Sequence, residues 1–128
     1  MAIATLIAGA LMAQAAAAPS LEATVTAPQI EQVDVGYADL MAGRPADAIA
    51  RIRDNRELDA SDPAALINLG TAYARLGRMN KAQDAYRSAI ASSTRYDLQL
   101  ADGRWMDSRQ AARLASRSLT TGQMLAVR

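Results

Sequence analysis

The chain contains no cysteine, no histidine and no phenylalanine. Without cysteine it can form no disulfide and no thiolate metal site, and it offers no thiol for a lipid anchor. Without histidine it lacks the side chain that proteins use most often as a general base and as a metal ligand, so a Ser-His-Asp triad is impossible. The sequence also has no glycine-rich phosphate loop. We therefore expect a non-catalytic protein with no metal or cofactor site.

Aromatic residues are scarce as well, since they make up 4% of a chain that is 51% hydrophobic. Alanine is the largest part of that hydrophobic fraction, and alanine-rich surfaces suit close contact between helices. The 128 residues are enough for one small domain. This composition favours an all-α fold.

An apolar run begins at Met1 and ends in Ala15-Ala16-Ala17-Ala18. Small residues at these positions are typical of a signal-peptidase site, so residues 1–18 are predicted to be a secretory signal. No Lys or Arg precedes the run, which leaves open a start further upstream. The alternatives are an uncleaved membrane anchor and an alanine-rich helix packed on the domain. Residues 19–32 contain two prolines and no helical period, and they are predicted to be an extended linker.

A motif recurs at a constant interval, because Gly36, Gly43 and Ala48 return as Gly70, Gly77 and Ala82. The interval matches the length of a helix-turn-helix repeat, which is roughly 34 residues. In the second copy, Asp62-Pro63 is a typical helix start, and a helix is predicted to follow as far as Gly77. A second helix is predicted from Met79 to the Ser92-Ser93-Thr94 run. The short turn between these two helices predicts an antiparallel pair.

The residues of this second copy resemble the signature of the tetratricopeptide repeat. The matching positions are Leu66, Leu69, Gly70, Tyr73, Gly77, Ala82, Tyr86 and Ala89. The preceding copy is degenerate, with Asp39 at the family's Tyr position, Ile52 at the aromatic position and Asn55 at an Ala position. The resemblance covers residues 29–96 and implies a short α-solenoid of two repeats over residues 33–96.

The family resemblance also implies a function, because the first helices of stacked repeats line a groove that binds peptides or other proteins. In this chain the positions that face the groove would be Ala64, Ile67, Asn68, Thr71, Ala74 and Arg75. Asn68 resembles one member of a clamp that some family members use for a peptide carboxylate, but the rest of that clamp is absent. We therefore interpret Ile67, Asn68, Thr71 and Arg75 as a general protein-binding groove.

A third repeat would need a glycine at position 104 and an alanine at 116, where the chain has Arg104 and Ser116. Instead, residues 97–106 alternate apolar and polar side chains around Asp102-Gly103, which predicts a small β-hairpin. The alternative is a loop with a buried tryptophan. Residues 107–120 are predicted to form a C-terminal capping helix, and the residues after it are expected to fray.

Charge is divided unevenly, since residues 1–62 carry a net charge of −5 and residues 63–128 a net charge of +6. The basic half includes a row of arginines at positions 109, 113 and 117, which lie on one face of the predicted helix. Such a surface could contact an acidic partner or an anionic membrane, and we expect no nucleic-acid partner.

The leading hypothesis is an exported adaptor or scaffold, periplasmic in a bacterium, that binds another protein or peptide. The alternative function is that of a structural envelope protein that associates with itself, for example as a homodimer. The alternative location is the membrane, to which the N-terminal segment would anchor the protein.

Overall fold

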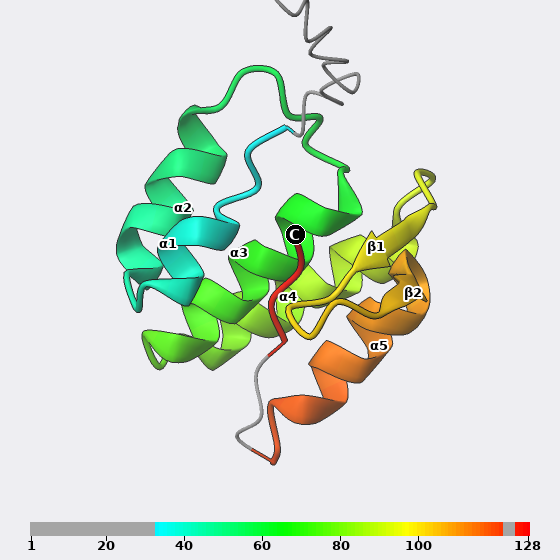
Figure 1. The fold of residues 1–128 in the computed structure, drawn as a ribbon. Coiled ribbons are helices and arrows are strands. Elements are labelled where there is room, and N and C mark those ends of the chain that lie inside the picture. Colours follow the sequence, from blue (N-terminus) through cyan, green and yellow to red (C-terminus); the bar gives the residue numbers. More distant parts are fainter. Residues whose placement is uncertain (1–32, 122–124) are drawn as a thin grey trace, which may run out of the picture. The chain divides into compact units, whose positions relative to one another are not determined.

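The computed structural model describes residues 33–121 and 125–128. The predicted signal (1–18) and linker (19–32) lie outside these residues. The described part is mostly helical with one two-stranded antiparallel sheet (Figure 1), so the prediction of a mostly α fold with a small hairpin is confirmed. In chain order, the elements are α1 (Tyr37–Met41), α2 (Pro45–Asp54), α3 (Pro63–Arg75), α4 (Met79–Ala91), β1 (Asp97–Gln99), β2 (Trp105–Asp107) and α5 (Ser108–Ser118).

Helix α3 starts as its sequence predicts. The Asp62 carboxylate accepts a hydrogen bond of 2.9 Å from the N–H of Ala65, and Pro63 occupies the first helical position. This cap satisfies one of the amides that a helix N-terminus leaves without a partner. The helix is the centre of the fold, since α2, α4 and α5 all pack against it.

The turns that follow α1 and α3 have the same conformation. Gly43 and Gly77 adopt φ angles of 73° and 76°, in the left-handed region that a residue with a Cβ disfavours. Each glycine ends one helix and lets the chain reverse into the next helix of an antiparallel pair. The two turns are separated by the interval of the sequence motif, as the repeat predicts.

The hydrogen bonds of these turns repeat at the same interval. The N–H of Arg44 donates to the carbonyl of Asp39 at 2.8 Å, and the N–H of Arg78 donates to the carbonyl of Tyr73 at 2.9 Å. The same shift relates three further pairs of bonds: Ala42 to Ala38 and Leu76 to Ala72, Gly43 to Leu40 and Gly77 to Ala74, Ala48 to Arg44 and Ala82 to Arg78. The repeated motif in the sequence therefore corresponds to a repeated pattern of main-chain hydrogen bonds at the two turns.

Gly70 lies where α3 packs directly against the Tyr86 side chain of α4. A Cβ on Gly70 would lie 2.5 Å from Cε1 of Tyr86, closer than two carbon atoms can approach without displacement. Tyr86 is 1% exposed, so its ring has no free space into which it could move. The contact explains why a helix interior carries a glycine at this position.

Helix α1 begins only at Tyr37, four residues after the start of the predicted repeat region at residue 33. The Asp34 carboxylate accepts a hydrogen bond of 2.9 Å from the N–H of Gly36. This local bond competes with helical hydrogen bonding and holds residues 34–36 in a turn. Only the five residues from Tyr37 to Met41 are helical.

The hairpin alternative for residues 97–106 is the correct one. Strands β1 and β2 pair with Leu98 opposite Met106, and Leu98 is buried while Trp105 is 68% exposed. The alternative of a loop around a buried tryptophan is therefore wrong. Helix α5 follows directly, and the Asp107 carboxylate caps it by accepting from the N–H of Gln110 at 3.2 Å.

Candidate functional site

The inner face of α3 does not form the open groove that the sequence suggests. Ile67, Asn68 and Thr71 are 0% exposed, and of the four predicted groove residues only Arg75 reaches the surface. Arg75 itself donates a hydrogen bond to the main-chain carbonyl of Leu40 and so ties α3 to the end of α1. Ile67, Asn68 and Thr71 are therefore not accessible to a partner, and of the predicted groove residues Arg75 alone is exposed.

Segment 125–128, drawn in red in Figure 1, covers this face of α3. The side-chain amide of Asn68 accepts a hydrogen bond of 2.9 Å from the N–H of Val127 and donates one of 2.7 Å to its carbonyl. The Thr71 hydroxyl donates to the carbonyl of Leu125. Ala126 and Val127 are 5% and 0% exposed, so the expectation that the last residues fray is wrong for them.

The hairpin holds the other edge of the same segment. Val127 forms an antiparallel bridge with Leu100, just after β1. The N–H of Arg128 donates to the carbonyl of Gln99 at 2.9 Å, and the N–H of Ala101 donates to that of Ala126 at 3.2 Å. The segment thus extends the hairpin like a third strand, and it lies between β1 and α3.

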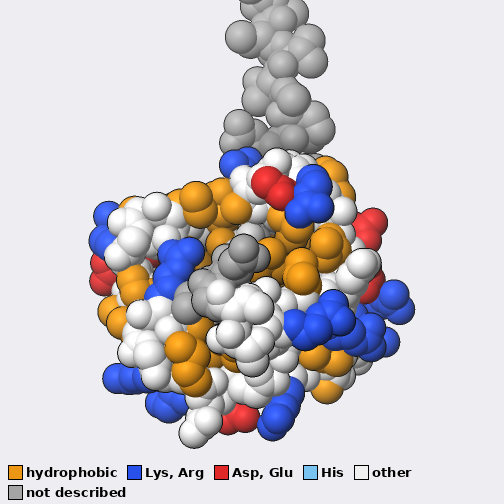
Figure 2. All heavy atoms as spheres, turned by 90° about the horizontal axis from the view of Figure 1, so that it is seen from below, with side chains coloured by type: hydrophobic (Ala, Val, Ile, Leu, Met, Phe, Trp, Pro, Cys, Tyr) orange, Lys and Arg blue, Asp and Glu red, His pale blue; other side chains and the backbone are white. Residues whose placement is uncertain are grey.

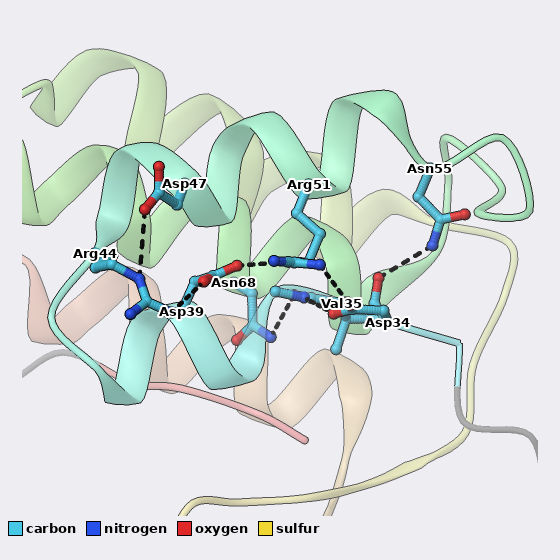
Figure 3. Close-up of polar contacts among 9 residues, drawn as sticks. Asp34, Val35, Asp39, Arg44, Asp47, Arg51, Asn55 and Asn68 are labelled. Atoms are coloured by element: carbon cyan, nitrogen blue, oxygen red, sulfur yellow. Dashed lines mark hydrogen bonds and ion pairs between the residues drawn. The ribbon is translucent and has the colours of Figure 1, made fainter.

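Both N–H donors of the Asn68 side chain and its carbonyl oxygen are engaged within the chain. Its second Nδ2 hydrogen donates to the carbonyl of Val35 at 2.9 Å, a contact drawn in Figure 3. An amide side chain has two N–H donors and a carbonyl oxygen, and here both donors and the oxygen are engaged by the main chain. Asn68 therefore fastens residues 33–35 and 125–128 to the same helix.

An open hollow remains beyond the N-terminal end of α3, with a volume of about 250 Å³. We call it the Trp105 hollow. Its lining residues are Val33, Val35, Asp62, Ala64, Tyr96, Asp97, Leu98, Gln99, Trp105 and Arg128. Ala64, at the N-terminal end of α3, is one of the residues expected from the sequence to face a groove, and segment 125–128 leaves it at the wall of this hollow.

Exposed hydrophobic side chains surround this hollow. Val33 is 42% exposed, Tyr96 is 40% exposed and Trp105 is 68% exposed. Successive side chains of a strand point to opposite faces, so Leu98 and Met106 point toward the core while Trp105 points outward. The hairpin thereby places a large aromatic side chain at the edge of a cavity.

Tyr96 has a fixed orientation at the rim of the hollow. Its hydroxyl donates a hydrogen bond of 2.7 Å to the Asp62 carboxylate, which also caps α3. Burial, together with the neighbouring Asp62 carboxylate, raises the pKa of Tyr96 above its ordinary value of 10. The hydroxyl therefore remains a donor at neutral pH, and the rim of the hollow is preorganised.

A second and larger surface cavity, of about 610 Å³, lies along α2. Five of its charged residues form what we call the Asp39 cluster, which comprises Asp34, Asp39, Arg44, Asp47 and Arg51 (Figure 3). Asp39 is 2% exposed and accepts from Arg51 Nε at 2.5 Å and from Arg44 Nη2 at 2.9 Å. Hydrogen bonds from Arg51 and then Arg44 lower the pKa of Asp39 below its ordinary value of 3.8.

The Asp39 cluster joins α1 to α2 through charge. Asp39 of α1 pairs with Arg44, which directly precedes α2, and with Arg51 of α2. Arg51 also bonds Asp34 at 3.3 Å, so the cluster is satisfied from within. Among residues 33–121 and 125–128, no group of three or more His, Cys, Asp or Glu is arranged to hold a metal ion.

The chain has no match among protein-family models, and searches of the curated proteins and of the solved structures found none. No helix in the described part of the chain is both long enough and apolar enough to cross a membrane.

Proposed function

We propose that the chain is a non-catalytic protein-binding module built from two tetratricopeptide-type helix pairs, and that it binds its partner at the Trp105 hollow. The repeat assignment is supported by the turn hydrogen bonds that recur at the interval of the sequence motif and by the close contact of Gly70 with Tyr86. The first pair, α1 and α2, is the degenerate copy and the second pair, α3 and α4, is the regular one.

The single observation that carries the binding surface is the exposure of Trp105 beside a cavity. Tryptophan is enriched among the residues that dominate the free energy of protein association, because it buries a large rigid surface at a small entropic cost. A 68% exposed tryptophan next to Val33 and Tyr96 is an apolar surface that a partner can cover. The remaining face of α3 is unavailable because segment 125–128 occupies it.

The hollow fits a segment of another protein that inserts one apolar side chain. Its floor is formed by Val35, Ala64 and Leu98, all of them buried or nearly so. Its rim carries Arg128 and Asp97, which can pair with polar groups of the incoming segment. This combination of an apolar centre and a polar edge is the usual anatomy of a protein interface.

The export of this module remains part of the proposal and is supported by the sequence of residues 1–18 alone. N-terminal sequencing of the protein recovered from the envelope fraction tests it. A new start near Ala18 is the expected result, and an intact Met1 in a cytoplasmic fraction would contradict it.

Capture of partners from a cleared envelope extract tests the binding surface. Trp105→Ala should lose the proteins that the wild-type chain retains, while Met41→Ala should keep them. Met41 is a matched control because it is 55% exposed and lies outside the hollow. Equal capture by both variants would show that the hollow is not the binding surface.

A further inference from the structure

A second exposed hydrophobic surface lies where α1 ends and where α3 turns into α4. Met41 is 55% exposed, Leu76 is 42% exposed and Met79 is 45% exposed. Leu76 and Met79 belong to the same turn, and neither lines the Trp105 hollow. Together with the nearby cations Arg75, Arg78 and Lys81, these three residues form what we call the basic pole.

The two helix ends of the basic pole are in contact. The guanidinium of Arg75, at the end of α3, donates to the carbonyl of Leu40 in the last turn of α1. Residue 41 is therefore next to the point where the two helix ends meet. In Figure 1 the α1–α2 turn and the α3–α4 turn both lie at the lower left, while the hairpin with Trp105 lies on the right.

The basic pole carries uncompensated positive charge. The sequence from Pro63 to Gln83 contains no Asp or Glu, and Arg75, Arg78 and Lys81 are all exposed. None of these three cations forms an ion pair with a described residue. Figure 2, which views the molecule from below, shows hydrophobic side chains among Lys and Arg side chains, with fewer Asp and Glu.

The carboxylates of α1, α2 and α4 form no ion pair with these cations. Asp39 is already shared by two arginines, and Asp47 pairs with Arg44 at 3.3 Å. The Lys81 ammonium lies 5.4 Å from the centre of the Tyr73 ring, and the Arg75 guanidinium donates to the Leu40 carbonyl. Both contacts leave the positive charge of these exposed side chains in place.

We propose that the basic pole docks on the surface of an anionic lipid bilayer. Arg78 and Lys81 contact lipid phosphates, and the side chains of Leu76 and Met79 enter the boundary between headgroups and acyl chains. A bilayer surface offers an anionic layer directly above an apolar one, which matches cations set beside short apolar protrusions. The surface around residues 77–81 is a shallow, open depression of about 290 Å³, so it suits a broad surface better than an inserted peptide.

The test is sedimentation of the full chain with two kinds of vesicle, one of phosphatidylcholine alone and one that also contains phosphatidylglycerol. Wild-type protein should bind the anionic vesicles more strongly, and added salt should weaken that binding. Replacing Arg78 and Lys81 by Gln should lower the partition coefficient about fivefold for each charge removed. Replacing Leu76 and Met79 by Ser should lower it as well, with the circular dichroism unchanged.

Matched controls separate this surface from the others. Arg113→Gln with Arg117→Gln removes two exposed cations of α5, and this variant should bind the anionic vesicles as the wild type does. Trp105→Ala should also retain vesicle binding, because the proposal is independent of the Trp105 hollow. Equal loss in the α5 variant would place the contact on another surface and overturn the proposal.

Two further outcomes would also overturn it. One is equal binding of the wild-type chain to neutral and anionic vesicles, which would show that the cations have no role. The other is salt-sensitive binding to polyglutamate, lost in the variant without Arg78 and Lys81, with no binding to anionic vesicles. That result would assign the basic pole to an acidic protein.

Discussion

The side-chain amide of Asn68 pairs with both main-chain polar groups of Val127, 59 residues away in the sequence. Because these two hydrogen bonds involve only main-chain atoms of residue 127, they do not depend on which side chain that residue carries. The chain has therefore filled the inner face of its own α3 helix with residues 125–128. The Trp105 hollow, where we propose that a partner binds, is left open by this segment.

Asn68→Ala should strongly destabilise the fold. It leaves the N–H and the carbonyl of Val127 and the carbonyl of Val35 without their side-chain partner in a buried site. Each of these three groups costs ~1–3 kcal/mol, so the loss should be at least about 3 kcal/mol. Urea unfolding measures it, with Asn80→Ala as the control because Asn80 is an exposed asparagine on α4. Equal stability of the two variants would contradict the role given to Asn68.

Gly70→Ala should lower stability even though alanine is the better helix former. In an open helix the change would stabilise by ~1 kcal/mol. Here the new Cβ meets the Tyr86 ring at 2.5 Å, and overpacking of this kind costs ~1–3 kcal/mol. Replacing Gly70 or Ala82 by Leu should destabilise further. The melting temperature of Gly70→Ala should therefore be lower than that of the wild type. A higher melting temperature would mean that residue 70 and Tyr86 are not in close contact.

Asp39 should make stability depend on pH in a defined direction. Because its pKa in the folded protein is lowered, its ion pairs contribute fully above its ordinary value of 3.8. This contribution is lost as the pH falls through the lower pKa of the folded state. The wild type should therefore be more stable than Asp39→Asn near neutral pH, and the gap should narrow below about pH 4. The measurement is the free energy of unfolding of both proteins from neutral pH to below pH 4. A difference between them that stays constant over this range would contradict the role given to Asp39.

The self-association alternative depends on attraction between the acidic and basic halves of two copies. Such attraction between exposed charges weakens as salt screens it. We expect the mass measured by light scattering to be that of a monomer at both low and high salt. A dimer at low salt that dissociates at high salt would favour the self-associating envelope protein.

Much of the fold could be predicted from local sequence. Asp62-Pro63 and Gly77 bound α3 because caps and turns act over a few residues, and Asp102-Gly103 correctly indicated the hairpin. These signals are carried by residues that are neighbours in the chain.

The closed groove could not be predicted in this way. Segment 125–128 offers its main-chain N–H and carbonyl groups to side chains of α3. Every residue carries a main-chain carbonyl, and nearly every residue carries an N–H, so these contacts cannot be predicted from the sequence pattern of the segment. The signal that was available was the pair Ala126-Val127, which is too apolar for a frayed end. Asp39 was similarly noted as a departure from the signature, but its two arginine partners lie 5 and 12 residues further along and required the fold to bring them together.

The most direct test of the central claim is a photo-crosslinking experiment at the Trp105 hollow. Because the chain has no cysteine, Gln99→Cys carries a photoreactive maleimide at one defined position in the lining of the hollow and leaves Trp105 in place. Gln110→Cys, on the exposed face of α5, serves as the control. Illumination in an envelope extract should yield a partner adduct from position 99 and little from position 110. An adduct from position 110 with none from position 99 would contradict the account.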